Sequence, residues 1–257
     1  MTQVFGEDLL IGLARAKHVV VFSGAGMSSE SGIPTFRDAQ TGLWEHYDPQ
    51  VLASPEGYQA DKPLVWGWYE SRRNQVLSAE PNEGHFAIAE LSDYVERLTI
   101  ITQNVDDLHE RAGSRSVKHL HGSLHNPRCF TCAEPYCFST EDQVEIVKDE
   151  RIEPPRCSEC NGYIRPGVVW FGESLPKDEW EQAEEAVLNC DVIFSIGTSS
   201  LVWPAAKLPD MAAVRGAKIV QINTNSTPLD SKAHYNFKGK AGDILPSLLR
   251  ELSELLD

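Results

Sequence analysis

The stretch HVVVFSGAG, residues 18–26, is the part of the sequence that decides the fold. A short apolar run, 18–22, ends in a glycine turn, which is the pattern of a strand buried on both faces. Three similar runs follow, at residues 98–102, 192–196 and 218–222. Helical patterns occupy residues 83–94, 177–188 and 245–256. Because strands alternate with helices, we predict an α/β fold with a parallel, doubly wound, Rossmann-like sheet.

Polar residues follow each of these predicted strands, where a doubly wound sheet binds its ligands. The turn Gly24-Ala25-Gly26 can bring backbone N–H groups close to a pyrophosphate, and Ser28 adds a hydroxyl, so we expect a dinucleotide. The pattern is GxGxxS, however, and no acidic strand end follows about 20 residues later, as dehydrogenases require for the ribose. The turn therefore predicts nucleotide binding outside the dehydrogenase pattern.

Four of the six cysteines form two CxxC pairs. Each pair presents two sulfurs from one turn, and four thiolates fill a tetrahedral zinc without leaving a position for water. We therefore expect one structural zinc, held by Cys129, Cys132, Cys157 and Cys160. Two disulfides or unpaired core thiols are the alternative, which a chain without an export signal disfavours.

We expect a single domain over residues 1–257 with two insertions. The Rossmann-like part covers about 1–33, 80–122 and 168–257. A helical and loop insertion, rich in Trp, Tyr and Pro, covers about 34–79, and a zinc-ribbon module covers about 123–167.

The composition is that of an ordinary globular protein, with 41% hydrophobic and 24% charged residues. The net charge of −15 argues against nucleic acid as a partner, because such binders usually present basic surfaces. We find neither a membrane-spanning run nor a secretory leader, and we expect a cytoplasmic protein with no membrane partner.

Five blocks together resemble the sirtuins, NAD-dependent protein-lysine deacylases. They are GAGMSSESGIPTFRD at 24–38, TQNVDDLH at 102–109, LHGS at 120–123, the paired CxxC motifs, and GTSSLVWPA at 197–205. The matches run in family order over nearly the whole chain. The resemblance implies that NAD is cleaved at its nicotinamide–ribose bond and that the acyl group of a modified lysine moves to the ribose.

The resemblance also implies roles for individual residues. His121 would be the general base for a ribose hydroxyl, a task that suits an imidazole with a pKa near 6.5; alternatively it only satisfies a core hydrogen bond. Asn104 and Asp106 would face the nicotinamide and Gln103 the ribose, although all three also suit a turn after a strand. Phe36 would shield the reactive carbon from water, and Arg37 would lie near the phosphates. Other expected cofactor contacts are Gly24, Ala25, Gly26, Ser28, Ile33, Pro34, Gly197, Thr198, Ser199, Asn223, Asn225 and Ala241.

The segments 167–173 and 200–203 would flank the peptide substrate, with Val169 and Phe171 lining the acyl-lysine tunnel. Segment 167–173 alone is equally consistent with a core strand. Tyr69 and Arg72 stand three apart on a predicted helix and form a Tyr-x-x-Arg motif. That motif resembles the one in the sirtuin branch that removes succinyl, malonyl and glutaryl groups, and a guanidinium suits a terminal carboxylate. The alternative is a solvated helix face, with Arg73 as an exposed neighbour.

We therefore predict an enzyme that removes succinyl, malonyl, glutaryl and acetyl groups from protein lysines and uses NAD as co-substrate. Acylated proteins would be its partners, and we expect a monomer. Two other functions remain open at this point: an NAD glycohydrolase or ADP-ribosyltransferase, and a non-catalytic NAD-sensing module.

Overall fold

The computed structural model describes residues 5–35, 48–138 and 151–256. The chain divides into two compact units. The first unit contains Met1–Gly32, Glu80–Leu120 and Pro176–Asp257, and the second contains Ile33–Ala79 and His121–Leu175. The division into a single domain with two insertions stays a prediction.

The first unit is built on a six-stranded sheet of order β3-β2-β1-β6-β7-β8, in which all neighbouring strands are parallel. Its strands are β1 (Val19–Ser23), β2 (Leu98–Thr102), β3 (Val117–His119), β6 (Val192–Ile196), β7 (Lys218–Asn223) and β8 (Tyr235–Lys238). The predicted α/β, Rossmann-like fold is confirmed.

Strand register brings the carboxyl ends of the three central strands level with one another. Ser23 at the end of β1 pairs with Thr102 of β2 and with Ile196 of β6. The chain runs outward from β1 through β2 and β3 and then returns to β6 on the other side of β1. The order thus reverses between β1 and β6, which is where doubly wound sheets bind ligands.

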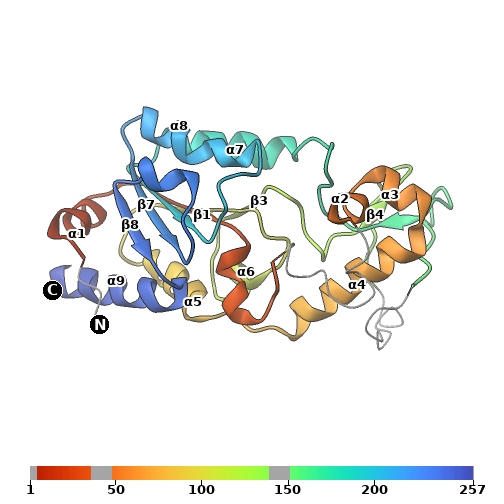
Figure 1. The fold of residues 1–257 in the computed structure, drawn as a ribbon, viewed down its shortest axis with the longest axis horizontal. Coiled ribbons are helices and arrows are strands. Elements are labelled where there is room, and N and C mark those ends of the chain that lie inside the picture. Colours follow the sequence, from red (N-terminus) through yellow and green to blue (C-terminus); the bar gives the residue numbers. More distant parts are fainter. Residues whose placement is uncertain (1–4, 36–47, 139–150, 257) are drawn as a thin grey trace. The chain divides into compact units, whose positions relative to one another are not determined.

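Helices cover both faces of this sheet (Figure 1). One face carries α1 (Glu7–Ala14), α5 (Glu83–Leu91) and α9 (Ala241–Leu256), and the other carries α7 (Lys177–Leu188) and α8 (Leu208–Val214). A short helix, α6 (Leu108–Arg111), follows the loop after β2. Short 3-10 turns occur at Ala25–Met27, Ser29–Ser31, Ala205–Lys207 and Pro228–Ser231.

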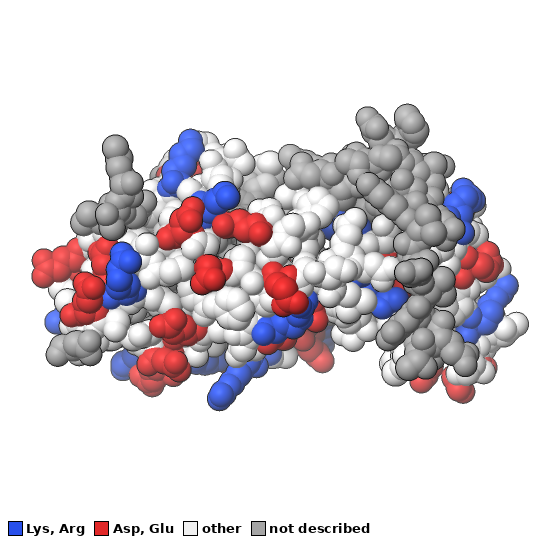
Figure 2. All heavy atoms as spheres, turned by 90° about the horizontal axis from the view of Figure 1, so that it is seen from below, with Lys and Arg blue, Asp and Glu red and all other residues white. Residues whose placement is uncertain are grey.

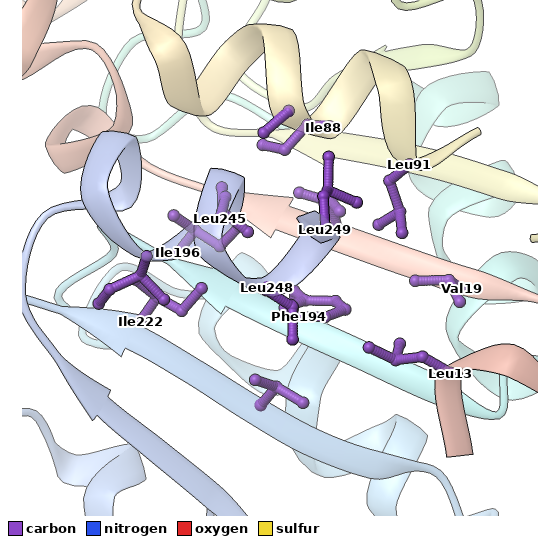
Figure 3. Packing of buried hydrophobic residues seen from close by; sticks show 14 of the residues in the cluster. Leu13, Val19, Ile88, Leu91, Phe194, Ile196, Ile222, Leu245, Leu248 and Leu249 are labelled. Carbon is purple, nitrogen blue, oxygen red and sulfur yellow. The ribbon is translucent and has the colours of Figure 1, made fainter. Parts of the chain in front are cut away.

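The apolar faces of α5 and α9 pack together on the sheet to form the core of the first unit. Ile88 of α5, Leu248 and Leu249 of α9 and Phe194 of β6 belong to one buried cluster, and Figure 3 shows Leu248 next to Phe194. Ile88 and Phe194 have no exposed surface. Complete burial of such a side chain contributes roughly 1.5–3 kcal/mol, so this packing holds the strand ends in place.

The predicted elements agree closely with the observed ones where burial is strong. The strands at 98–102 and 192–196 and the helix at 177–188 have the predicted bounds. The last helix starts four residues earlier than predicted, at Ala241, and α5 ends at Leu91. Asn82 fixes the start of α5, because its side chain accepts a hydrogen bond from Gly84 N at 3.0 Å.

The second unit combines helices with a small antiparallel ribbon. Its helices are α2 (Pro49–Leu52), α3 (Pro55–Ala60) and the 17-residue α4 (Lys62–Ser78). Asp61 caps α4 by accepting a hydrogen bond from Leu64 N at 3.2 Å. The ribbon pairs β4 (Arg128–Cys129) with β5 (Ile164–Arg165).

Acidic side chains are spread over the face drawn in Figure 2, with basic ones between them, in keeping with the net charge of −15. Among the helices of the described residues, none is both long and apolar enough to cross a membrane.

Candidate active site and cysteine centre

The glycine turn after β1 packs backbone to backbone against the turn after β6. Gly26 N donates a hydrogen bond to Gly197 O at 2.8 Å, and Gly24 N donates to Ile196 O at 3.0 Å. A Cβ on Gly26 would lie 2.7 Å from the Gly197 Cα, so a side chain does not fit there. A Cβ on Gly24 would likewise lie 2.9 Å from the Thr198 Cα. Gly24 and Gly26 are therefore both required for this contact between the two loops, in addition to any role in binding a phosphate. Ala25, between them, is exposed.

A buried polar cluster joins the turn after β1 to the loop after β2. The Asn104 side-chain amide donates to Ser28 Oγ at 2.9 Å, and the Asn104 backbone N–H donates to Thr102 Oγ1 at 3.0 Å. Ser28 is 1% exposed, Asn104 7% and Asp106 5%. These side chains lie where the strand order reverses, which is where the sequence predicted a ligand site.

Asp106 is the buried acid of this cluster. Burial raises the pKa of the Asp106 carboxyl above its ordinary value, and hydrogen bonds from Leu108 N and the Ser28 hydroxyl oppose that shift. The Leu108 bond is 3.2 Å long. A carboxylate held this way has oriented oxygens and a fixed set of neighbours, which suits recognition of a polar ligand group.

An ion pair that sequence reasoning missed supports the same loop. Glu110 Oε1 lies 2.6 Å from His119 Nε2, and His119 Nδ1 lies 3.3 Å from the Asn104 carbonyl oxygen. Burial would lower the pKa of His119, but the Glu110 carboxylate raises it above its ordinary value. The Glu110 carboxylate thus stabilises a proton on His119, and both ring nitrogens of a charged imidazole are donors, one of them toward the Asn104 carbonyl oxygen.

The loops after β6 and β7 are linked to the same edge. Gln103 Nε2 donates to Thr198 Oγ1 at 2.9 Å, and Asn223 Nδ2 donates to Thr198 O at 2.8 Å. Thr198 therefore connects three strand ends. Two other predicted contacts, Ser199 and Asn225, are exposed in these loops.

The remaining predicted cofactor residues are divided between the two units and the part of the chain that the structure does not describe. Ala241 is 5% exposed and begins α9. Ile33 and Pro34 belong to the second unit. Phe36 and Arg37 lie outside the described residues. Their predicted roles stay predictions.

His109 lies beneath the loop after β2 and is 1% exposed. Its Nε2 lies 2.9 Å from Ser23 Oγ, which in turn donates to Thr102 Oγ1 at 3.0 Å. Burial lowers the pKa of His109 to about 3, so its ring is neutral at neutral pH. A short hydrogen-bonded chain therefore runs from His109 to the Thr102 hydroxyl that holds Asn104.

His121, the predicted general base, lies in the second unit, in the turn that follows Leu120. Val169 N donates to His121 O at 2.8 Å, and Gly122 forms an antiparallel bridge with Val168. Gly122 has a φ of 73°, and a Cβ there would lie 2.1 Å from Gly167 O, so only glycine fits. This backbone pairing fixes His121 alongside the segment predicted to line the acyl-lysine tunnel.

The four cysteines of the two CxxC pairs converge on one point. All four sulfurs lie within 4.8 Å of one another. The Sγ–Sγ distance is 3.4 Å for Cys129–Cys160 and 3.7 Å for Cys132–Cys157. A disulfide needs about 2.05 Å, whereas sulfurs about 2.3 Å from a shared zinc stand roughly 3.8 Å apart. The cluster therefore fits one tetrahedral zinc, and the disulfide alternative does not describe it.

Backbone groups around the cluster favour thiolates. Burial would raise the pKa of the Cys129 thiol, but the N–H groups of Cys132 and Thr131 point at its sulfur and lower the pKa to about 6. Gly162 stands against the cluster, and a Cβ there would lie 3.0 Å from Cys129 Sγ. These donors are the outer contacts that metal-bound cysteines use.

The predicted acyl-binding residues all lie in the second unit. Tyr69 of α4 is 5% exposed, and its hydroxyl accepts a hydrogen bond from Trp170 Nε1 at 3.0 Å. The Arg72 guanidinium lies 5.3 Å from the Trp68 ring centroid. In the predicted tunnel segment, Val169 is half-buried and Phe171 is 50% exposed.

One alternative raised for α4 is wrong. Arg73 is 6% exposed and is not the exposed neighbour of Arg72. Its Nη2 lies 2.6 Å from Glu70 Oε2, and its guanidinium lies 3.8 Å from the Phe138 ring centroid. An arginine on a helix face can be buried if a carboxylate and an aromatic ring both receive it, and the sequence did not reveal those partners.

The fold and this polar edge define a class: doubly wound α/β proteins that bind a ligand at the carboxyl ends of their strands, here with a four-cysteine centre in a second unit. Residues 24–204 match the Sir2 family. The chain belongs to the Sir2 family.

Its relatives are similar over nearly their whole length. The NAD-dependent protein deacylase of Methylococcus capsulatus is 57% identical over 96% of this chain and 97% of its own. NAD-dependent protein deacylase 1 of Pseudomonas aeruginosa is 53% identical over 93% of this chain and 95% of its own. Among solved structures, a Sir2 homologue in complex with NAD has a TM-score of 0.89 and 45% identity, covering 99% of this chain and 96% of its own.

Proposed function

We propose that this protein removes acyl groups from protein lysines and uses NAD as co-substrate. Relatives at 57% and 53% identity are named NAD-dependent protein deacylases, and similar structures hold NAD or ADP-ribose. One observation in the chain itself carries the proposal: Ser28, Asn104 and Asp106 form a buried polar cluster where the strand order of the sheet reverses.

The reaction exchanges a nicotinamide for an acyl group on the same ribose. The nicotinamide–ribose bond of NAD breaks, the acyl oxygen of the modified lysine bonds to the ribose carbon, and water completes release of the lysine. The products are nicotinamide, O-acyl-ADP-ribose and unmodified lysine.

The chain's own residues bind the nicotinamide and move a proton. Asn104 and Asp106 would hold the nicotinamide carboxamide, which needs both a donor and an acceptor, and Gln103 would hold the ribose. A polar cluster already fixed by Ser28 and Thr102 loses little entropy when a ligand binds. His121 would take the proton of a ribose hydroxyl, which makes that oxygen a nucleophile for the acyl carbon.

A zinc held by Cys129, Cys132, Cys157 and Cys160 would stabilise the fold of the second unit. Four thiolates leave no position for water or substrate, so the metal would take no part in the reaction.

Tyr69 and Arg72 would select acyl groups that end in a carboxylate, as in succinyl-, malonyl- and glutaryl-lysine. The two residues stand three apart on α4 and so share a helix face. A guanidinium provides paired N–H donors and a phenol provides one more, whereas an acetyl group presents no charge to either. Acetyl-lysine would still enter, because it is smaller. Acylated proteins would be the partners, with the chain acting as a monomer in the cytoplasm.

The experiment that tests the function supplies one peptide carrying acetyl-, succinyl-, malonyl- or glutaryl-lysine, with NAD, and detects products by mass spectrometry. We expect nicotinamide, O-acyl-ADP-ribose and deacylated peptide in equal amounts. Steady loss of NAD without peptide would indicate a glycohydrolase instead. Binding of NAD in a calorimeter without turnover of any peptide would indicate a sensing module.

A second experiment tests the acyl preference. Arg72→Met should lower kcat/KM for the succinyl peptide by roughly 10- to 150-fold, because a hydrogen bond to a charged group is worth about 1.5–3 kcal/mol. Deacetylation should change little. Equal losses for both peptides would give Arg72 a structural role.

A further inference from the structure

The hydrogen bond between Trp170 and Tyr69 has only one possible direction. Trp170 Nε1 lies 3.0 Å from Tyr69 Oη. An indole N–H donates and never accepts, so the tyrosine oxygen is the acceptor. The tyrosine's own proton therefore points elsewhere, and Tyr69 has one donor to offer.

The Tyr69 hydroxyl also stays protonated. Tyr69 is 5% exposed and Trp170 is 2% exposed, so the bond between them is shielded from water. Burial raises the pKa of Tyr69 well above its ordinary value. At any working pH the group is a neutral O–H donor.

Trp170 is itself held on its backbone and on its ring face. Its backbone N–H donates to Glu173 Oε2 at 2.8 Å. Glu173 forms a bidentate ion pair with Arg165, and the Arg165 guanidinium lies 3.5 Å from the Trp170 ring centroid. The Tyr58 ring adds a further contact, with a centroid separation of 5.3 Å. The indole N–H is thus fixed in direction by a buried charged group.

Tyr69 and Arg72 share a second aromatic support. The Tyr69 ring packs edge-on against Trp68 with a centroid separation of 4.6 Å, and the Arg72 guanidinium lies 5.3 Å from the same Trp68 ring. The Tyr69 ring is therefore located by Trp68, and its hydroxyl is located by Trp170.

We propose that Trp170 is a positioning residue for acyl specificity. By donating to Tyr69 Oη, it occupies one side of that oxygen and leaves the tyrosine proton for the carboxylate of an acidic acyl group. Without the indole N–H, the hydroxyl can rotate between several orientations, and binding must first select one. This inference rests on the proposed role of Tyr69 and Arg72 in binding that carboxylate.

The test compares the ratio of kcat/KM for succinyl and acetyl forms of one peptide. Trp170→Phe removes the N–H and keeps an aromatic ring for Arg165 to stack on. We expect the ratio to fall about three- to tenfold, the range that one neutral hydrogen bond supplies. Tyr69→Phe should lower the ratio at least as much, and in the Tyr69→Phe background Trp170→Phe should lower it no further.

Tyr58→Phe is the matched control. It removes a buried hydroxyl that donates to Ile164 O at 2.5 Å, on a ring that also contacts Trp170 but leaves Tyr69 untouched. We expect its ratio to equal that of the wild type. A ratio that falls equally in Tyr58→Phe, or that falls again in the double variant, would overturn the proposal.

The two levels of inference fail in different ways. If Tyr69→Phe and Arg72→Met leave the ratio unchanged, the proposed acyl selectivity itself is wrong. If those variants lower the ratio and folded Trp170→Phe does not, only the role of Trp170 is wrong.

A spectroscopic measurement covers the case in which Trp170→Phe does not fold. In protein labelled at the indole nitrogens, Tyr69→Phe should shift one indole N–H resonance and speed its exchange with solvent. If every indole resonance stays in place, the hydrogen bond does not exist in solution and the proposal is overturned.

Discussion

The side-chain amide of Asn104 donates a hydrogen bond to Ser28 Oγ at 2.9 Å and so joins the loop after β2 to the turn after β1. The two residues are 76 positions apart in the sequence, yet strand register makes β1 and β2 end at the same level. A ligand at this edge meets a pair that is already formed, and this preformed contact underlies the following predictions.

Replacing Asn104 tests the polar cluster directly. Asn104→Ala removes both the bond to Ser28 and the predicted contact with the nicotinamide. We expect nicotinamide release to slow on the order of 100-fold, as when a preorganised donor is lost from an active site. Rates would be measured with NAD and acyl peptide at saturating concentrations.

Asn189→Ala provides the control, because Asn189 is an exposed asparagine at the end of α7 whose amide donates to Glu185 O at 2.7 Å. It should keep the wild-type rate. If Asn104→Ala were as active as this control, the cluster would have no part in the reaction.

The four-cysteine centre predicts one zinc for each chain. Cys157→Ser should lose the metal and lower the melting temperature of the second unit, because zinc binding and folding are coupled. Metal analysis and calorimetry measure the two effects. Cys137→Ser alters an exposed cysteine outside the cluster and should retain full zinc content. Equal zinc in both variants would exclude the proposed ligand set.

The pair formed by His119 and Glu110 predicts a pH-dependent contribution to stability. The pKa of His119 is raised in the folded state, so its ion pair with Glu110 stabilises the fold fully below about pH 6.5. That stabilisation is lost as the pH rises through the folded-state pKa of His119. Burial would raise the pKa of Glu110, but His119 lowers it, so the contribution is also lost as pH falls below about 4.5.

Glu110→Gln should therefore lower the free energy of unfolding most between about pH 4.5 and 6.5, by up to about 1 kcal/mol for a pair this exposed. Urea unfolding at several pH values measures the difference from the wild type. A difference that does not vary with pH would show that the two groups are not ionised together.

The left-handed backbone conformation of Ala133 predicts that a glycine at this position stabilises the fold. Ala133 follows the second cysteine of its CxxC pair with a φ of 62°, as Asn161 does at 59° after the other pair. A left-handed conformation costs an alanine about 1–2 kcal/mol, and glycine avoids that cost while losing more entropy on folding. Ala133→Gly should therefore raise the free energy of unfolding by up to about 1 kcal/mol.

The comparison variant is Ala112→Gly, at a residue with a φ of −77°. It should lower the free energy of unfolding in the same assay. If both substitutions lowered the free energy of unfolding by the same amount, the positive φ of Ala133 would not be a source of strain.

The sequence alone predicted the strongly buried parts of the fold. Continuous apolar runs at residues 98–102 and 192–196 are buried in the centre of the sheet, and their bounds were predicted correctly. The edge strands β3 and β8 were missed, because Val117–His119 is short and half-buried and Tyr235–Lys238 buries only Phe237. Neither strand has an apolar run that periodicity could detect.

The candidate site shows a similar division. Residue types at strand ends predicted where Asn104 and Asp106 lie, because parallel strands share one carboxyl edge. Their partners depend on contacts between distant segments, so Glu110 and His119 could not be found from spacing. A contact between distant segments also explains why residues 24 and 26 must be glycine, since both pack on the turn at Gly197.

One measurement tests the central claim most directly: the stoichiometry of a single reaction with NAD and a succinyl-lysine peptide. Nicotinamide, O-succinyl-ADP-ribose and free-lysine peptide should appear in a one-to-one-to-one ratio. His121→Ala should remain folded but form neither O-succinyl-ADP-ribose nor free-lysine peptide. Nicotinamide released with plain ADP-ribose, while the peptide keeps its acyl group, would contradict the account.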